Sequence, residues 1–404
     1  MNIEEFKASV PIIQYVKNIY SDILPIVRES NGKAFCRCIW HEDDTPSLVF
    51  FADTNKYKCF GCGEHGDIID LVKYVEKVDW KEAVQIIAQN TGQVVNIGNP
   101  SSDTRHKMQC EEYKNMMCKH AVRYMENLKA NEQAMTYLTQ TRKLSLETID
   151  TFRLGLTSQE EYRFRSDIGN ISNKISIPIM EPKMNAKCIG FAYNDMFNNK
   201  PKYINDHNQD GRNGQNPDIA GVFIKGNVLF GYPLAKQSAN KIGRVFLCEG
   251  YYDVMSMYSS GIKNIVASMG TGFTQEQTNL MKTLSNDIVL MYDMDNAGKQ
   301  AAMKNAIALY GAGHNVYVCL YDAHDPDELA KKFNNDGNWI IDHINSHLVN
   351  GIDYIIRNLT ENYHSIVSKE RESILCTAEM WYNLLPEGLK KQEFKHKLFA
   401  ELGI

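Results

Sequence analysis

The stretch Asp287-Ile-Val-Leu-Met-Tyr-Asp-Met-Asp295 is an apolar run that ends on two carboxylates one residue apart. The apolar residues favour a buried strand, so Asp293 and Asp295 stand directly after its carboxyl end. Successive residues of an extended chain point to opposite sides, and we therefore expect both aspartates to face the same side. Carboxylate oxygens are the ligands that Mg²⁺ prefers in proteins. The stretch predicts a strand whose end binds a metal.

Two further apolar runs have the same arrangement. Arg244-Val-Phe-Leu-Cys248 stops at Glu249, and the run 315–321 leads within four residues into Asp325-Pro-Asp327. The segments between the runs read as helices, at residues 251–260, 274–284 and 296–310. This order predicts a βαβαβαβ unit with a mainly parallel sheet, in which sites form beyond the carboxyl ends of the strands. A single Asp-x-Asp is usually a loop or a helix cap, but five carboxylates after consecutive strands predict a magnesium site for phosphoryl or nucleotidyl transfer.

Length and composition describe an ordinary globular chain. The 404 residues can hold two or three domains, with 43% hydrophobic and 23% charged residues. We expect a cytoplasmic protein, since no apolar stretch is long enough to span a membrane and the N-terminus lacks the form of a signal peptide. The net charge of -5 argues against a nucleic-acid partner, yet bases gather between residues 163 and 236. This stretch is either a basic groove beside the acidic site or a solvated basic surface.

A cluster of metal-ligand residues lies near the N-terminus. Cys38-Ile-Trp-His41 and Cys59-Phe-Gly-Cys62 are two ligand pairs, each with two intervening residues. Four such ligands suit tetrahedral Zn²⁺, and with no position left for water the role is structural. We expect Gly61 and Gly63 to supply the positive backbone angles of the knuckle. Strands at 47–52 and 56–58 would complete a zinc ribbon.

Cys36 offers a competing thiolate. Cys36-Arg-Cys38 matches a knuckle less well than Cys38-x₂-His41, so we assign Cys36 to packing and keep ligation as the alternative. Aromatic residues interleave with bases around these pairs, an arrangement that can stack and neutralise single-stranded DNA. A small zinc ribbon also needs aromatics as core, so we expect half of them to be structural. The aromatics are Trp40, Phe50, Phe51, Tyr57 and Phe60, and the bases are Arg37, Lys56 and Lys58.

The chain divides into segments of different character, which predict an α+β/α/β multidomain architecture. The polar, Gly/Pro/Ser-rich stretch 92–104 reads as a flexible linker, 109–152 as helices, 174–179 and 187–193 as paired strands, and 351–404 as closing helices. We therefore predict a zinc ribbon (1–95), a linker (96–108), a basic subdomain (109–240), the acidic α/β unit (241–340) and a helical subdomain (341–404).

These motifs together resemble the bacterial DnaG-type primases. Cys38-Ile-Trp-His41-Glu-Asp-Asp-Thr-Pro-Ser47 and Tyr57-Lys-Cys-Phe-Gly-Cys-Gly-Glu-His-Gly-Asp67 are similar to that family's zinc motif. Its Toprim catalytic segments resemble Glu249-Gly-Tyr-Tyr-Asp253, Ala267-Ser-Met-Gly-Thr271, Asp293-Met-Asp-Asn-Ala-Gly298 and Asp325-Pro-Asp327. Its basic subdomain resembles Phe152-Arg-Leu-Gly155, Lys174-Ile-Ser-Ile-Pro-Ile179, Ile189-Gly-Phe191 and Pro201-Lys-Tyr-Ile-Asn205.

Two departures from the family pattern stand out. Where the family usually continues Gly-Phe with Gly-Gly-Arg, this chain has Ala192-Tyr-Asn194, so one expected phosphate-binding arginine is absent. The sequence also stops at Ile404, near the end of the family's polymerase domain. We therefore expect any replicative helicase to be contacted in a non-standard way, as in a phage or mobile-element primase.

The resemblance implies a DNA primase, which copies a single-stranded DNA template into a short RNA primer from ribonucleoside triphosphates. Asp293, Asp295, Asp325 and Asp327 would hold Mg²⁺ or Mn²⁺, and Glu249 would contact the metal or accept the proton of the primer 3′-hydroxyl. The expected phosphate and primer-template contacts are Lys174, Lys202, Asn205 and Lys225, with Arg163 and Arg165. A Toprim nuclease or strand-passing enzyme, and a non-catalytic DNA-binding protein, are the alternatives.

Overall fold

The computed structural model describes residues 3–93, 102–158, 170–183, 185–197, 199–206, 222–270, 273–361, 363–365 and 368–403. The chain forms two compact units, one of Met1–Gln109 with Lys183–Ala186 and one of the remaining residues to Ile404. The finer boundaries that the sequence suggests, at residues 240 and 340, stay predictions. No helix in the described part of the chain combines the length and the apolar character needed to span a bilayer.

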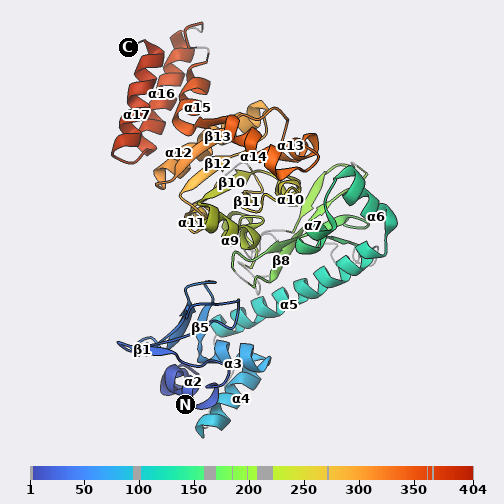
Figure 1. Ribbon diagram of the computed structural model, residues 1–404, viewed down its shortest axis with the longest axis vertical. Helices are drawn as coiled ribbons and strands as arrows, with labels where there is room; N and C mark the ends of the chain where they lie inside the picture. The colour runs from blue at the N-terminus through green and yellow to red at the C-terminus, as the bar shows by residue number, and fades with distance from the viewer. Residues whose placement is uncertain are drawn as a thin grey trace. The chain divides into compact units, whose positions relative to one another are not determined.

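The first unit is built on a five-stranded antiparallel sheet in the order β1-β2-β3-β4-β5 (Figure 1). Its strands are β1 (Arg28–Ser30), β2 (Lys33–Cys36), β3 (Leu48–Phe51), β4 (Lys56–Cys59) and β5 (His65–Asp67). Its helices are α1 (Ile3–Ser9), α2 (Ile12–Ile19), α3 (Ile68–Glu76) and α4 (Trp80–Thr91). The inward residues of the strands, such as Leu48 and Phe50, pack with Ile12 and Leu71 of the helices into one core. The predicted zinc-ribbon strands are thus confirmed, with three strands that the sequence did not reveal.

Helix α5 (Ser102–Lys129) begins inside the predicted linker. The linker prediction is therefore wrong from Ser102 onward, and residues 94–101 lie outside the described part of the chain. The stretch Pro100-Ser-Ser-Asp103 has the composition of a loop, but proline followed by Ser and Asp is equally typical of a helix start. Only the later periodicity distinguishes the two.

The second unit begins with helices and a four-stranded sheet in the order β6-β7-β8-β9. After α5 come α6 (Glu132–Thr136), a π-helical turn (Tyr137–Thr141), α7 (Leu146–Thr151), β6 (Gly155–Leu156), β7 (Ile175–Met180), β8 (Cys188–Asn194) and β9 (Tyr203–Asn205). All neighbours are antiparallel, and β7 with β8 is the hairpin that the sequence predicts.

The acidic segment forms a second sheet in the order β11-β10-β12-β13-β14 (Figure 1). Its elements follow a 3₁₀ turn at Lys225–Asn227: α9 (Tyr232–Ile242), β10 (Arg244–Cys248), α10 (Tyr251–Ser259), β11 (Ile265–Ala267), α11 (Gln275–Lys282), β12 (Asp287–Leu290), α12 (Asn296–Gly311), β13 (Asn315–Cys319), α13 (Pro326–Lys332), α14 (Gly337–Ser346) and β14 (Leu348–Asn350). The pairs among β10 to β13 are parallel, and only β14 is antiparallel. The predicted mainly parallel sheet is confirmed.

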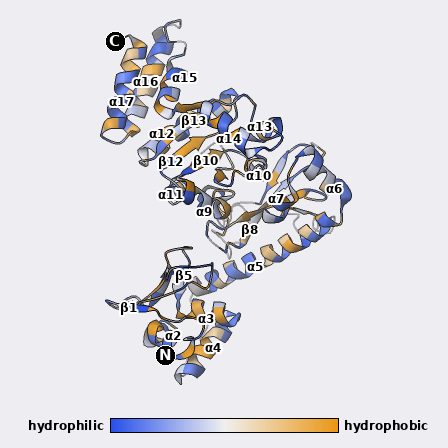
Figure 2. Cartoon of the chain, in the orientation of Figure 1, coloured by the Kyte–Doolittle hydropathy of each residue, from blue (hydrophilic) through white to orange (hydrophobic). Residues whose placement is uncertain are grey.

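Strand β10 shows why this sheet is buried on both faces. Val245 and Leu247 pack into a core with helix α12, while Phe246 and Cys248 pack into a second core with helix α10. The strand therefore reads as a continuous apolar run, as Figure 2 shows for the centre of this sheet. The closing helices are α15 (Gly351–Thr360), α16 (Ser368–Leu384) and α17 (Leu389–Leu402).

Candidate functional site

The four predicted zinc ligands come together in the first unit. The ligand atoms of Cys38, His41, Cys59 and Cys62 all lie within 4.8 Å of one another. The Sγ atoms of Cys38 and Cys62 are 3.8 Å apart, and Nδ1 of His41 lies 3.9 Å from Sγ of Cys59. This is the donor set and spacing of a closed tetrahedral site, so the residues present fit one structural Zn²⁺.

Backbone amides complete the two knuckles. The amide of Trp40 donates to Sγ of Cys38, and that of Cys62 donates to Sγ of Cys59, each at 3.4 Å. Gly63 has a φ of 83°, as expected, whereas Gly61 is not in the left-handed region. The positive backbone angle expected at Gly61 is therefore wrong. A Cβ there would lie 2.6 Å from Nε2 of His41, so this glycine makes room for the ligand ring.

Asp43 supports the cluster from outside. Its Oδ2 accepts hydrogen bonds from the amides of Cys38 (2.7 Å) and Ser47 (3.1 Å) and from the Ser47 hydroxyl (2.7 Å), and its Oδ1 lies 3.8 Å from Nε2 of His41. Burial raises the pKa of Asp43, but these hydrogen bonds outweigh it and lower the pKa. An ionised carboxylate facing Nε2 leaves Nδ1 for the metal.

The structure shows which of Cys36 and the aromatic residues belong to the core of the first unit and which belong to its surface. Cys36 is fully buried outside the ligand cluster, and burial raises the pKa of its thiol to about 12, which supports packing. Trp40 stacks on Tyr57 with ring centroids 5.1 Å apart, and both are buried with Phe50. The remaining two aromatics, Phe51 and Phe60, belong to the outward face of the sheet, where Phe60 is 65% exposed.

The second unit gathers carboxylates at one edge of its parallel sheet. Leu247, Leu290 and Val318 are paired neighbours in β10, β12 and β13, so residues after them leave the sheet at the same edge. Burial raises the pKa of Glu249 to about 7, with further contributions from Asp293 and Asp295. Its Oε1 is buried and has no hydrogen-bond partner among the described residues.

The neighbouring carboxylates show the same mutual repulsion. Burial raises the pKa of Asp293, and Asp325 adds to it, while His324 and Lys202 act in the opposite direction. Asp253 on helix α10 is fully enclosed, and burial followed by the charges of Asp325 and Asp293 raises its pKa to about 8. A divalent cation would relieve this repulsion, because an opposite charge favours the ionised form of each carboxyl.

The two Asp-x-Asp pairs are not equivalent. Asp295 caps α12 by accepting from the amide of Gly298 at 2.8 Å, and Asp325 caps α13 by accepting from the amide of Glu328 at 2.7 Å. Asp327 lies inside α13, so the expectation that an extended chain turns Asp325 and Asp327 to the same side is wrong. Proline after Asp325 starts a helix there instead of prolonging the strand.

Asp327 is also already neutralised. Its side chain accepts from Lys331 at 2.7 Å and from Arg142 at 3.3 Å, and it accepts from the hydroxyl of Ser256. Among the described residues, only the zinc cluster brings three or more metal-ligand atoms within 4.8 Å of one another. The described carboxylates of the acidic edge are therefore not gathered as closely as the four zinc ligands.

The predicted phosphate contacts fall into three groups. Lys202 lies close enough to Asp293 to affect its titration, and Lys225 is half-buried, which lowers its pKa. Lys174 is instead buried and paired with Asp195 at 2.6 Å, and Asn205 accepts from the Tyr251 hydroxyl at 2.6 Å. Arg163 and Arg165 lie outside the described residues. The charge of Lys174 is thus already compensated by Asp195.

Residues that the sequence did not single out complete this region. Arg142 lies 3.8 Å from the ring centroid of Tyr252 and donates to the hydroxyl of Tyr137 at 2.8 Å. No motif surrounds Arg142, because its partners are distant in the chain. Asp253, by contrast, belongs to the motif Glu249-Gly-Tyr-Tyr-Asp253.

Comparison with known proteins gives a match in each of the two units. Residues 2–103 match the family model described as CHC2 zinc finger, and residues 246–330 match the one described as Toprim-like. A DNA primase of Clostridium acetobutylicum is 29% identical over 97% of this chain and 68% of its own length. A DNA primase of Aquifex aeolicus is 30% identical over 82% of this chain and 66% of its own length. This chain thus spans about two thirds of the length of these relatives.

Solved structures share the fold of these units. The crystal structure of the zinc-binding and RNA polymerase domains of the Aquifex aeolicus primase covers 100% of this chain and 97% of its own, with 25% identity and a TM-score of 0.58. A DnaG primase catalytic domain bound to single-stranded DNA covers 73% of this chain and 97% of its own, with 23% identity and a TM-score of 0.59. An antiparallel zinc ribbon and a Toprim-like sheet in one chain are the two features that define the class of DnaG-type primases. The chain belongs to the DnaG-type primase family.

Proposed function

We propose that this chain is a DNA primase that synthesises short RNA primers on single-stranded DNA from ribonucleoside triphosphates. The observation that carries the proposal is the acidic edge of the β10–β14 sheet, where Glu249, Asp253 and Asp293 all have raised pKa values. The positive charge of Lys202 acts to lower the pKa of Asp293 at this edge. Carboxylates that repel one another next to a lysine suit divalent cations and a triphosphate.

The acidic residues would hold Mg²⁺ or Mn²⁺, which when bound neutralises charge on the attacking and leaving oxygens of nucleotidyl transfer. Asp327 is the weakest candidate, because Lys331 and Arg142 already compensate its charge. The proposed ligands are Glu249, Asp293, Asp295, Asp325 and Asp327.

The chain's own side chains would orient the reactants and move the proton. Glu249 would either contact the metal or accept the proton of the primer 3′-hydroxyl, and burial raises its pKa to about 7 when no cation is bound. Lys202 and Lys225 would neutralise phosphate oxygens, with Asn205 placed by Tyr251. Positioning and charge neutralisation account for most of the acceleration in phosphoryl transfer.

The outward face of the zinc ribbon would hold the template. Three cation-aromatic pairs lie on strands β1 to β4 or directly after them: Arg28 over Phe35 at 4.2 Å, Lys33 over Phe51 at 5.4 Å and Lys58 over Phe60 at 5.5 Å. Such pairs can stack bases and neutralise phosphates without reading sequence.

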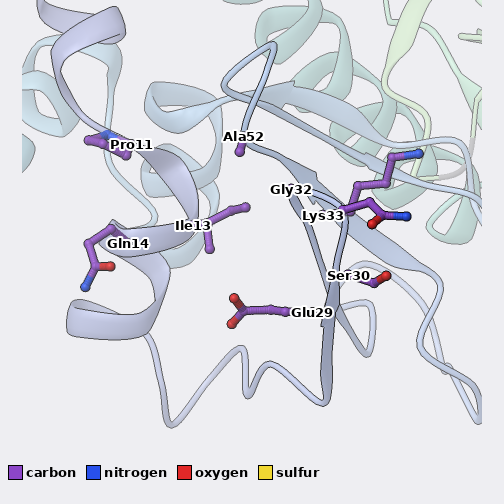
Figure 3. A pocket seen from close by; sticks show the side chains of 9 residues that line it. Pro11, Ile13, Gln14, Glu29, Ser30, Gly32, Lys33 and Ala52 are labelled. Atoms are coloured by element: carbon purple, nitrogen blue, oxygen red, sulfur yellow. The ribbon is translucent and has the colours of Figure 1, made fainter.

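In the same unit, a cavity of about 510 Å³ lies between α2 and the β1–β2 hairpin, lined by Ile13, Glu29 and Lys33 among others (Figure 3). Its lining includes no zinc ligand.

The experiment that tests the proposal incubates the pure chain with single-stranded DNA, Mg²⁺ and labelled ribonucleotides. We expect oligoribonucleotides from the wild type and none from Asp293→Asn. Asp287→Asn is the matched control, since Asp287 lies at the opposite end of the same strand. Cut DNA would favour a Toprim nuclease, and neither product would favour a non-catalytic DNA-binding protein.

A further inference from the structure

Asn194 occupies the position at which the sequence departs from the family's arginine. It is the last residue of β8, and its side chain is fully buried. Its Oδ1 accepts hydrogen bonds from the hydroxyls of Tyr137 and Tyr252, both at 3.1 Å, and its Nδ2 donates to the carbonyl of Lys202 at 3.2 Å. A buried amide with three partners at one point of the fold is held in a single orientation.

The direction of these hydrogen bonds follows from the groups involved. The carbonyl of Lys202 can only accept, so Nδ2 must face it and Oδ1 must face the two tyrosines. Both hydroxyls must then donate to Asn194. The hydroxyl of Tyr137 keeps an acceptor site, which Arg142 Nε fills at 2.8 Å. The result is one continuous series of hydrogen bonds from Arg142 through Tyr137 and Asn194 to the carbonyl of Lys202.

Arg142, at one end of this series of hydrogen bonds, contacts the acidic half of the proposed active site, and Lys202, at the other end, belongs to its basic half. Arg142 pairs with Asp327, and its guanidinium stacks on the ring of Tyr252. Lys202 directly precedes β9, whose Asn205 accepts from the hydroxyl of Tyr251, two residues after Glu249. Among the described residues the carbonyl of Lys202 has one other partner, the amide of Asp195 at 3.4 Å, which is longer than the bond from Asn194.

We propose that Asn194 is a positioning residue: it fixes the backbone of Lys202, and with it the base of the Lys202 side chain at the start of β9, against the Arg142–Tyr137 pair. This inference rests on the proposed function, because it assigns Lys202 to the incoming triphosphate. An arginine at residue 194 would place a second cation within two hydrogen bonds of Arg142 in a buried setting. The chain therefore uses a neutral amide to organise cations that other residues supply.

Asn194→Asp tests this inference because it replaces only the NH₂ group of the amide, the group that donates to Lys202, with an oxygen. The carboxylate has nearly the same volume and can still accept from both tyrosines, but it cannot donate to Lys202. It also sets an anionic oxygen against a carbonyl oxygen. We expect KM for the ribonucleotide in extension of a supplied primer to rise about tenfold, within the range for an unmade buried hydrogen bond, with kcat changed less than threefold. Tyr252→Phe, which leaves the bond to Lys202 intact, should raise KM far less.

A double-mutant cycle separates positioning from general loosening. If Asn194 acts through Lys202, Asn194→Asp should change KM less than twofold in a Lys202→Ala background. Asn127→Ala is the matched control, since it removes a comparable bond from a side-chain amide to the carbonyl of Leu156. We expect no change of KM in that variant.

Each outcome decides one of the two claims. A wild type that incorporates no ribonucleotide overturns the proposed function. An active wild type in which the effects of Asn194→Asp and Lys202→Ala multiply, or in which Asn127→Ala raises KM equally, overturns the positioning role. If Asn194→Asp does not fold, Asn194→Ser enters the same cycle, since its hydroxyl is too short to reach both sides. Multiplying effects in that cycle would again reject the inference.

Discussion

Removal of one zinc ligand should affect zinc affinity far more than removal of the buried thiol next to it. The free energy of binding for structural zinc is about 10–16 kcal/mol at neutral pH, so each of four ligands contributes roughly 2.5–4 kcal/mol. Cys59→Ala should therefore weaken zinc about 10²- to 10³-fold. Cys59 also lies in the core of the first unit, and we expect that unit to lose its cooperative unfolding transition.

The measurement is a competition titration with a chromogenic chelator, together with zinc content after gel filtration. Cys36→Ala is the control, since Cys36 is equally buried but outside the cluster. It should keep one zinc per chain. If Cys36→Ala loses zinc as readily as Cys59→Ala, the ligand set is wrong. We further expect Cys59→Ala to impair initiation on a bare template more than extension of a supplied primer, and equal losses would mean that zinc merely holds the fold.

Three other perturbations test the second unit. Asp293→Asn should abolish primer synthesis yet raise the thermal midpoint of the metal-free protein, because it removes one of several repelling charges; a lower midpoint than that of Asp287→Asn would contradict the repulsion. Burial raises the pKa of Asp195, but the hydrogen bond from Lys174 and those from nearby amides outweigh it and lower the pKa to about 2. The stability that this carboxylate contributes is present above its unfolded pKa and is lost as the pH falls from about 4 to about 2, so Asp195→Asn should flatten that part of the acid unfolding curve. Gly298→Ala places a Cβ against the carbonyl oxygen of Asp293 and should destabilise the chain by roughly 1–3 kcal/mol in urea unfolding while weakening Mn²⁺ binding.

The sequence predicts those parts of the molecule that local patterns determine. The strand β12 and its terminal aspartates follow from an apolar run and its stop, and the parallel sheet follows from three such runs separated by helices. The zinc cluster follows from two short pairs, since a knuckle needs only neighbours in the chain. Both features depend on distances of a few residues, which a single sequence records.

Other parts depend on partners that are distant in the chain. Lys174 carries the charge expected of a phosphate contact, yet Asp195 pairs with it in the fold. The bond between Tyr252 and Asn194 joins residues 58 positions apart, and that between Arg142 and Asp327 joins residues 185 positions apart. Residue type alone does not show which charges meet in the fold.

The most direct test of the account is an anomalous difference map from a crystal soaked with Mn²⁺. The account predicts a peak at the carboxyl edge of the β10–β14 sheet, coordinated by Glu249, Asp293 and further acids of that edge, and no peak in Asp293→Asn crystals. Fully ordered carboxylates with no manganese among them, in a soak that labels other sites, would contradict it.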